Sequence, residues 1–378
     1  MPVITNIEDL RQMARRRVPK AVFDYVDRGS YDEQTLRGNR AAFAEIGLRQ
    51  RVGWNVENRS TKTTMLGEDV NMPLAIAPTG LTGLNWANGE ILGALAAEKA
   101  GIPFTLSTMS ICSIEDVSAA VSKPFWFQLY VMRDRDFVAD LIARAKRAKV
   151  SALMLTMDLQ IQGQRHMDIR NGLSVPPRMT LSNALDMCKK IPWAMNMLTT
   201  KRKTFGNLDG YVKDTTGINN LSQWIAGQFD PTLSWDDVAW VKSLWGGKLI
   251  VKGVLDVQDA RMAAQVGIDA LVVSNHGGRQ LDGASPAIRA LPKIVEAIGD
   301  RTEVWIDGGI QSGQDVFKSI ALGATGCLIG KAWLYGLGAM GEAGVSTALE
   351  IIRKELDVTM ALTGNTDIRE VTRDSLQL

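Results

Sequence analysis

The sequence predicts an α/β fold, a single (β/α)8 TIM barrel that spans residues 1–378 as one domain. Eight short apolar segments are typical of buried strands, and amphipathic stretches of helical period separate most of them. Alternating strands and helices build parallel sheets, and eight such units are the number that closes a barrel. An open, doubly wound parallel sheet is the alternative.

The first elements along the chain are helices within residues 1–50, which precede the barrel. Asn6 is a suitable N-cap for a helix over Ile7–Arg17, because the apolar residues of that segment share one face. Pro19 opens a second helix, and a third is expected from Asp32 to Phe43.

The repeating units of the barrel follow these helices. The predicted strands are Pro73–Ala77, Pro103–Leu106, Phe125–Leu129, Ala152–Thr156, Leu249–Lys252, Ala270–Val273, Glu303–Ile306 and Gly326–Ile329. The clearest helices between them are Gly89–Ala100, Asp134–Ala148, Val257–Val266 and Asp315–Leu322.

The connection after the fourth predicted strand is much longer than a barrel needs. Thr156 and Leu249 lie about ninety residues apart, whereas a strand–helix unit needs roughly thirty. We assign residues 178–225 to an insertion, since loops of this length in compact folds are usually functional. Its first part is rich in Met, Leu and Trp and has lysines nearby. It is therefore either a lid over the barrel mouth or a segment that lies on an anionic membrane surface.

The composition sets limits on function. With 46% hydrophobic and 22% charged residues the chain has the balance of an ordinary globular protein, and a net charge of +2 argues against nucleic-acid binding. No signal peptide and no membrane-spanning apolar run is evident. We expect a cytoplasmic protein, or one that is peripheral at the inner face of the cell membrane. Cys112, Cys188 and Cys327 lack metal-ligand spacing, so we expect buried thiols and no metal.

Residues at the C-terminal ends of the strands line the active site in barrels of this type. Every predicted strand end carries polar groups or glycines that a purely structural barrel would not need. In chain order these ends are Ala77-Pro78-Thr79, Ser107, Gln128 with Tyr130, Thr156 with Asp158, Lys252, Ser274 with His276, Asp307-Gly308-Gly309, and Gly330-Lys331. The repetition predicts a ligand site at this end of the barrel.

The stretch Ser274–Asp282 is the most informative of these strand ends. It places His276 and Arg279 three residues apart on a glycine-rich turn, where both can act on one substrate. The chain has only 2 histidines, so a general base that works near neutral pH has few candidates.

The last two strand ends, Gly308-Gly309 and Gly330-Lys331, precede helical segments. Glycine lets backbone N–H groups approach a ligand closely, and a helix N-terminus favours anions. In TIM barrels the phosphate site commonly follows the seventh and eighth strands. These turns therefore predict a phosphate site.

On these motifs the chain resembles the FMN-dependent α-hydroxy-acid oxidase and dehydrogenase family, whose members oxidise L-lactate, glycolate or mandelate. The resemblance covers essentially the whole length. Its motifs here are Ala21–Tyr25, Ala77–Gly80, Trp126–Tyr130, Ser274–Asp282 and Asp307–Gly309. The histidine motif is the most specific of them.

The resemblance implies a role for each polar side chain near the substrate. His276 takes the proton of the substrate, and Asp158 supports the cationic form of the imidazole. Arg165 and Arg279 bind the substrate carboxylate, to which the guanidinium fork is suited. The hydroxyl groups of Tyr25 and Tyr130 bond to substrate oxygens, while Met109 and Gln162 border the substrate side chain.

The resemblance also implies FMN as the cofactor. Lys252 lies beside the N1 edge of the flavin, where a fixed cation favours reduction. The flavin ring is held by Ser107, Gln128, Thr156 and the segment Ala77, Pro78 and Thr79. Ser274 and Asp307 contact the ribityl chain, and the phosphate is met by Gly308, Gly309, Gln311, Gly330 and Lys331.

Two residues at the phosphate end depart from the family pattern. Gln311 and Lys331 stand where family members usually carry arginines that meet the phosphate. Lysine keeps the charge but loses the planar fork, and glutamine loses the charge. We therefore expect FMN to bind through backbone N–H groups and Lys331, but more weakly.

The expected reaction is oxidation of an L-2-hydroxy acid, with L-lactate as the leading substrate. Gly80 and the insertion favour a dehydrogenase that passes electrons to a quinone, a cytochrome or another carrier. The alternatives are an oxidase that uses O2 and releases H2O2, a flavin-dependent isomerase, and a catalytically impaired ligand-binding paralogue. The resemblance further implies a homo-oligomer, specifically a tetramer.

Overall fold

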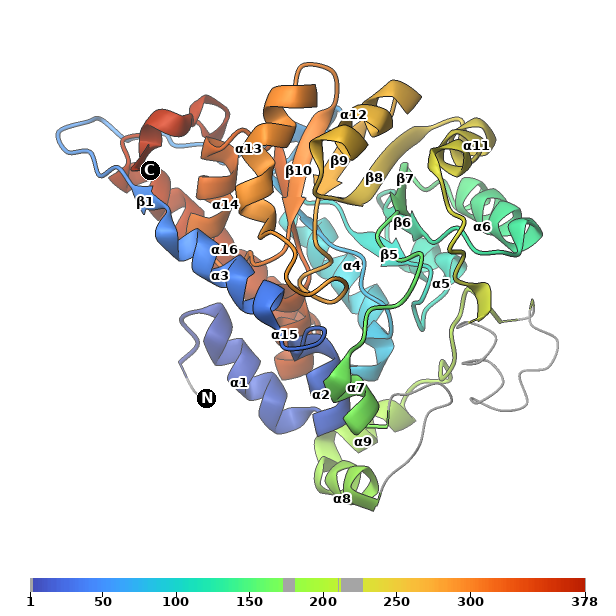
Figure 1. The fold of residues 1–378 in the computed structure, drawn as a ribbon. Helices are drawn as coiled ribbons and strands as arrows, with labels where there is room; N and C mark the ends of the chain where they lie inside the picture. Colours follow the sequence, from blue (N-terminus) through green and yellow to red (C-terminus); the bar gives the residue numbers. More distant parts are fainter. Residues whose placement is uncertain (1–2, 173–180, 210, 212–226, 378) are drawn as a thin grey trace.

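The computed structural model of the chain describes residues 3–172, 181–209, 211 and 227–377. An 8-stranded parallel sheet forms its centre (Figure 1). Its strands are β4 (Leu74–Ile76), β5 (Thr105–Ser107), β6 (Trp126–Leu129), β7 (Ala152–Thr156), β8 (Lys248–Val254), β9 (Ala270–Val273), β10 (Glu303–Asp307) and β11 (Gly326–Ile329). A parallel bridge between Ile76 and Phe104 joins the two end strands and completes the ring. The predicted barrel is confirmed, and the open sheet is wrong.

The outer layer consists of helices that connect these strands. They are α4 (Gly89–Ala100), α5 (Ile114–Ala120), α6 (Arg135–Arg147), α11 (Trp235–Trp245), α12 (Val257–Val266), α13 (Ala287–Ile298) and α14 (Gly313–Ala321), followed by α15 (Lys331–Met340) and α16 (Glu342–Leu362). The predicted barrel helices and strands agree with these bounds to within about two residues, the usual uncertainty of element ends.

The barrel interior is a separate apolar cluster, because alternate residues of each strand point inward. In β7, Ala152 and Met154 belong to this inner cluster, whereas Leu153 and Leu155 pack outward against the helices. Trp126 and Trp305 stack inside the barrel with ring centroids 5.0 Å apart. The interior is therefore filled by side chains, which leaves the rim for a ligand.

Short elements complete the framework around the barrel. They are the hairpin β2 (Thr63–Met65) and β3 (Glu68–Val70), the 3-10 helices η1 (Thr82–Leu84), η2 (Ile368–Glu370) and η3 (Arg373–Ser375), and the antiparallel pair β1 (Gly47–Leu48) and β12 (Leu376–Gln377). The hairpin contributes Met65 to the inner cluster.

The predicted N-terminal helices are confirmed as α1 (Ile7–Arg17), α2 (Lys20–Asp27) and α3 (Gln34–Glu45). Asn6 caps α1, since its side chain accepts from the Asp9 N–H while Asp9 accepts from the backbone N–H of Asn6. α1 packs on α15, and α2 lies below the barrel in the view of Figure 1.

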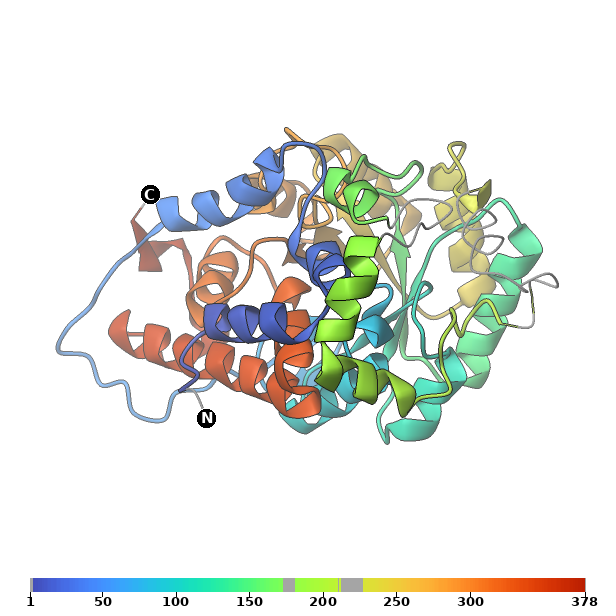
Figure 2. The same ribbon diagram turned by 90° about the horizontal axis from the view of Figure 1, so that it is seen from below.

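The predicted insertion contains α8 (Leu181–Lys189) and α9 (Ile191–Leu198), preceded by α7 (His166–Arg170). Residues 178–180, 210 and 212–225 of the predicted range lie outside the described residues. Figure 2 shows α7, α8 and α9 beside α2, across the end of the barrel that carries the strand C-termini. Cys188 of α8 is exposed, so the expectation of a buried thiol is wrong there. No helix in the described part of the chain is long and apolar enough to cross a membrane.

Candidate active site

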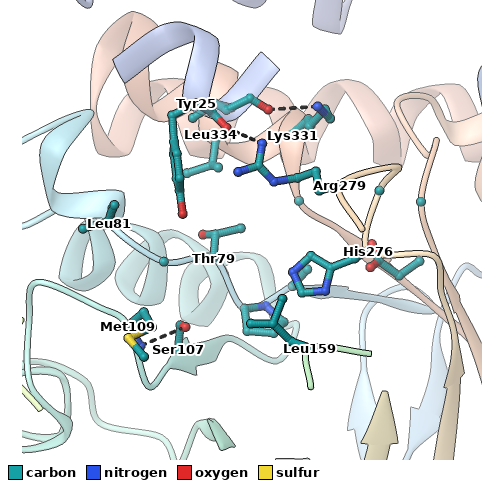
Figure 3. A pocket seen from close by; sticks show the side chains of 18 of the residues that line it. Tyr25, Thr79, Leu81, Ser107, Met109, Leu159, His276, Arg279, Lys331 and Leu334 are labelled. Carbon is teal, nitrogen blue, oxygen red and sulfur yellow. Dashed lines mark hydrogen bonds between the residues drawn. The ribbon is translucent and has the colours of Figure 1, made fainter. Parts of the chain in front are cut away.

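A cavity of about 410 Å³ opens at the C-terminal ends of the strands. Its volume lies within the roughly 300–1,000 Å³ that is typical of small-molecule and cofactor sites. Most of the residues predicted from the sequence line it: Tyr25, Ala77, Pro78, Thr79, Ser107, Tyr130, Arg165, Lys252, His276, Arg279, Asp307, Gly308, Gly309, Gln311, Gly330 and Lys331. The structure therefore brings residues from all parts of the chain into one site (Figure 3).

Four predicted residues, Gln128, Thr156, Asp158 and Ser274, are not among the described residues that line the cavity. Gln128 accepts a hydrogen bond from Ser107, and Ser274 bonds to Lys252. Asp158 bonds to His276, and Thr156 pairs with Lys252 in the sheet register. These four residues contact the lining residues from the barrel side.

His276 and Asp158 form a hydrogen-bonded pair. His276 lies on the loop after β9, and Asp158 lies on the loop after β7. The imidazole Nδ1 is 2.9 Å from the Asp158 carboxylate. Burial lowers the pKa of His276 below its ordinary value, although the Asp158 charge acts in the opposite direction. Since Nδ1 is engaged by the carboxylate, the neutral imidazole presents Nε2 as its proton acceptor. This geometry suits a general base.

The approach of Asp158 to this position depends on Gly253 in β8. Gly253 has φ +101°, and a Cβ at this position would lie 2.5 Å from Cγ of Asp158. Any other residue would therefore displace the carboxylate or distort the strand. Burial opposes the charge of Asp158, but His276 and Lys252 together hold its pKa below the ordinary value.

Arg165, Arg279 and Asp168 form a buried charged group beside His276. Nε of Arg165 donates to the backbone oxygen of Arg279 at 3.2 Å, and Arg279 Nη2 lies 4.0 Å from the Asp168 carboxylate. The Arg279 guanidinium lies over the Tyr25 ring, 4.7 Å from its centroid. Burial and the charge of Arg165 lower the pKa of Arg279, but arginine stays charged in proteins. The two guanidinium charges of this group exceed the single carboxylate charge of Asp168, which lies 4.0 Å from Arg279. The group can therefore bind an anion.

Tyr130 lies at the end of β6 and lines the cavity. Its ring packs edge-on against Phe229, with centroids 6.2 Å apart. Burial raises the pKa of its hydroxyl, and the nearby Asp158 charge adds to that effect. The phenol therefore stays protonated near neutral pH and can donate a hydrogen bond.

Lys252 is a buried cation at the end of β8, with 4% of its side chain exposed. Its ammonium group lies 2.9 Å from the Asp307 carboxylate and 3.1 Å from the Ser274 hydroxyl, which in turn donates to Asp307. Burial opposes the charge, but the Asp307 and Asp158 carboxylates raise the pKa of Lys252 above its ordinary value. The cavity wall therefore carries a fixed positive charge.

The glycine turns after β10 and β11 lie at the other end of the cavity. α15 begins at Lys331, so the positive end of its helix dipole points toward Gly330. The Lys331 ammonium group donates to the backbone oxygens of Val26, Asp27 and Arg28 at the C-terminal end of α2. Burial and the neighbouring Arg279 lower the pKa of Lys331 to about 7. Figure 3 shows Lys331 and Arg279 side by side.

An apolar wall completes the cavity. It consists of Leu81, Met109, Leu159, Phe205 and Phe229. Met109 and Gln162, which were predicted to border the substrate side chain, both line the cavity. His166, to which the sequence assigned no role, is exposed and lies edge-on to Tyr31.

Comparison with known proteins agrees with the fold and with the family resemblance of the sequence. The model of the FMN-dependent dehydrogenase family matches residues 14–378. An L-lactate dehydrogenase of Caulobacter sp. (strain K31) is 45% identical over 375 residues, which are 99% of this chain and 98% of that protein. The crystal structure of the monotopic membrane protein (S)-mandelate dehydrogenase superposes with a TM-score of 0.95 at 36% identity, over 100% of both chains. A mandelate oxidase structure with (S)-2-phenylpropionate has a TM-score of 0.83 at 33% identity, over 99% of this chain and 98% of that one.

The chain therefore belongs to the FMN-dependent dehydrogenase family. FMN is accordingly its cofactor, and the described residues fit this group. The Gln128 side-chain nitrogen is buried and has no hydrogen-bond partner among the described residues, as expected where a ligand atom completes the bond. Lys252 supplies a buried cation, and the glycine turns lie at the opposite end of the same cavity.

The lining residues that sequence reasoning missed include Asp168, Leu159 and Arg40. Asp168 lies on α7 in the long connection, where strand-end logic gives no signal. Leu159 directly follows Asp158 and could have been found by extending the β7 end by one residue. Arg40 lies on α3, and no local pattern in the sequence indicates that this helix reaches the glycine turns.

Proposed function

We propose that this chain catalyses the FMN-dependent oxidation of an L-2-hydroxy acid to the 2-oxo acid, with L-lactate as its main substrate and pyruvate as the product. FMN supplies the acceptor for the two electrons that this oxidation releases. The observation that best supports the proposal is the His276–Asp158 pair, because its imidazole lines the same cavity as Arg165 and Arg279. The 45% identity to a protein named L-lactate dehydrogenase supports lactate.

His276 is the general base, and it takes a proton from the substrate through Nε2. The lowered pKa keeps the imidazole neutral, and thus ready to accept, at neutral pH. Asp158 stabilises the imidazolium that forms, because its carboxylate lies 2.9 Å from Nδ1.

Arg165 and Arg279 bind the substrate carboxylate and orient the hydroxyl-bearing carbon toward His276. Their guanidinium groups match the planar, bidentate geometry of a carboxylate. Tyr25 and Tyr130 donate hydrogen bonds to substrate oxygens, since both line the cavity beside the arginines. Closure of the site by apolar side chains such as Leu81 and Phe229 strengthens these electrostatic contacts.

Lys252 offsets the negative charge that the cofactor site gains on reduction. Asp307 and Ser274 hold the lysine in place through the hydrogen bonds described above. The remaining predicted contacts to FMN come from Ala77, Pro78, Thr79, Ser107, Gln128 and Thr156 on the ring side, and from the turns at Gly308, Gly309, Gln311, Gly330 and Lys331 at the phosphate end.

Anaerobic bleaching of the flavin absorbance across a panel of L-2-hydroxy acids tests this proposal. We expect L-lactate to bleach the FMN-loaded protein fastest, and D-lactate to leave the flavin oxidised. A colourless protein that no 2-hydroxy acid reduces after FMN has been added would instead support a ligand-binding role without catalysis.

The electron acceptor separates a dehydrogenase from an oxidase. We propose a quinone or a cytochrome as the acceptor, because the curated relatives carry dehydrogenase names. The likeness to a mandelate oxidase makes O2 the second candidate. Stopped-flow mixing of the reduced protein with O2 and with a soluble quinone distinguishes them. Faster reoxidation by O2, with stoichiometric H2O2, would identify an oxidase.

We further propose that α8 and α9 rest on the inner face of the cell membrane. Their exposed apolar side chains are Leu185, Ile191, Met195 and Leu198, each more than 60% exposed. Lys189 and Lys190 lie at the junction of the two helices, and such a pattern suits an anionic interface. A structurally similar (S)-mandelate dehydrogenase is described as monotopic.

Co-sedimentation with vesicles that contain an anionic phospholipid tests this placement. We expect the wild-type protein to sediment with them, and an Ile191→Ser, Leu198→Ser double variant to remain in the supernatant. Equal sedimentation of both proteins would favour the lid interpretation, in which Trp193 anchors α9 by donating to the Leu84 backbone oxygen at 2.8 Å.

A homotetramer is the oligomeric state that we propose from the family resemblance. Light scattering during gel filtration measures this directly, and a mass equal to the 41.3 kDa chain would contradict it.

A further inference from the structure

The phosphate end of the cavity contains few positive charges that are free to meet a phosphate. Gln311 is neutral, and Lys331 already donates to three backbone oxygens at the end of α2. Lys331 also loses part of its charge near neutral pH, because burial lowers its pKa to about 7. A phosphomonoester carries close to two negative charges at this pH, so a further cation would stabilise it.

Arg40 is a further cation that lines the cavity beside these turns. It belongs to α3 and lies with Gly309 and Gln311 in the cavity wall. Its Nη1 donates to the Gly309 backbone oxygen and, at 2.6 Å, to the Asp315 carboxylate. The same carboxylate oxygen accepts the backbone N–H of Gln311 at 2.9 Å. The guanidinium and the backbone of residue 311 are therefore held together by one buried aspartate.

The rest of the guanidinium group remains available to a ligand. Both hydrogen bonds that the side chain makes within the described residues come from Nη1, and 43% of the side chain is exposed. Arginine has five N–H donors, and two donors on one edge of the guanidinium group match two phosphate oxygens.

α3 is fixed firmly enough to position this side chain. Asn39 and Asn275 exchange two buried side-chain hydrogen bonds of 2.9 and 2.8 Å. The Asn39 backbone oxygen would lie 3.0 Å from a Cβ at position 309, so glycine at this turn permits the close approach of the helix. Lys318 of α14 donates to the Phe43 oxygen near the C-terminal end of α3.

We infer that Arg40, supplied by N-terminal helix α3, binds the phosphate group of FMN and takes the role of an arginine at position 311. The inference rests on FMN as the cofactor and not on which hydroxy acid is oxidised. It makes α3 part of the cofactor site.

The comparison of FMN with riboflavin tests this inference, because the two flavins differ only in the phosphate. Titration of the apoprotein, followed by quenching of flavin fluorescence, gives both dissociation constants. We expect Arg40→Ala to raise the Kd for FMN about 10- to 100-fold, while the Kd for riboflavin changes less than about twofold. Arg37→Ala is the matched control, since Arg37 is exposed on the same helix and does not line the cavity.

The outcomes separate a phosphate contact from a structural role. Equal weakening of FMN and riboflavin would mean that Arg40 only holds α3 through Asp315 and Gly309, and no weakening of FMN would also overturn the inference. Should Arg40→Ala fail to fold, Arg40→Gln keeps a donor for Gly309 and gives the same comparison. A wild-type protein that bound neither flavin would contradict the proposed function instead.

Discussion

The two ends of the cavity are built from different parts of the chain. At the histidine end, charged groups from the strand ends of the barrel pair with one another, as in His276–Asp158 and Lys252–Asp307. At the phosphate end, Lys331 contacts the last carbonyls of α2, and Arg40 comes from α3. The strand ends of the barrel therefore hold the His276–Asp158 and Lys252–Asp307 pairs, whereas the phosphate end depends on side chains and carbonyls of the N-terminal helices.

The largest expected effect is at the histidine end. His276→Ala removes the proposed base, so the rate of anaerobic flavin reduction by L-lactate should fall about 1,000-fold or more. The FMN dissociation constant should stay within about threefold of the wild-type value, because the phosphate end is unchanged. Stopped-flow absorbance measures the rate.

The only other histidine provides the control for that variant. His166 is exposed, lies edge-on to Tyr31 and is not among the described residues that line the cavity. In the His166→Ala variant, L-lactate should reduce the flavin at the wild-type rate. A His276→Ala protein that lost FMN as well would show that the two ends are not independent.

Asp158→Asn should have the next largest effect. Loss of the carboxylate destabilises the imidazolium, so the reduction rate should fall roughly 10- to 100-fold. Because the Asp158 charge raises the pKa of His276, its removal should lower that pKa further. The acid limb of the pH profile of kcat/KM should therefore move to lower pH. An acid limb that stayed in place would assign it to another group.

At the phosphate end, the affinity for FMN should depend on pH through Lys331. In the free protein this lysine, with a pKa of about 7, is charged below pH 7 and increasingly neutral above it. A bound phosphate raises the pKa of Lys331, so the contribution of this lysine to the affinity is present below pH 7 and is lost as the pH rises. From pH 7 to 9 the Kd should rise by roughly tenfold, while the charge of the phosphate stays nearly constant.

Lys331→Arg is the matched variant for this pH effect, because its guanidinium stays charged throughout the range. Its Kd for FMN should be nearly flat from pH 7 to 9, and riboflavin should show no dependence in either protein. A wild-type curve as flat as that of the variant would mean that Lys331 keeps its charge or does not meet the phosphate.

The smallest expected effect is that of Gln311→Arg, which adds a second arginine beside Arg40. The two like charges repel, so the gain in FMN affinity should be only about threefold to tenfold. Riboflavin affinity should be unchanged. In an Arg40→Ala background the same substitution should give a larger gain, and equal gains in both backgrounds would show that the two positions act separately.

The sequence predicted the cavity-lining residues well where they lie at the ends of strands. The barrel and the N-terminal helices could be predicted because periodic apolar residues mark each helix and strand. The lining residues at strand ends could be predicted because polar residues or glycines directly follow each apolar strand. The boundaries of α4 and α12, for example, agree residue for residue, since glycines follow both helices.

Contacts between distant segments were not predictable from a single sequence. Arg40 approaches the glycine turns because long-range contacts such as the Asn39–Asn275 pair dock α3 there, and those two residues lie 236 positions apart. Lys331 was expected to meet the phosphate, and nothing in the sequence indicates that its ammonium group also donates to carbonyls at the end of α2. The exposure of Cys188 likewise depends on how α8 packs, which its own sequence does not specify.

The pairing of β1 with β12 bears on how this protein is handled. Leu376 and Gln377 form a two-residue ladder with Gly47 and Leu48, directly after the helix that carries Arg40. Truncation of the chain near residue 377, or a bulky extension there, should therefore loosen the anchor of α3. The resulting loss of flavin would appear as a weaker flavin absorbance of the purified protein.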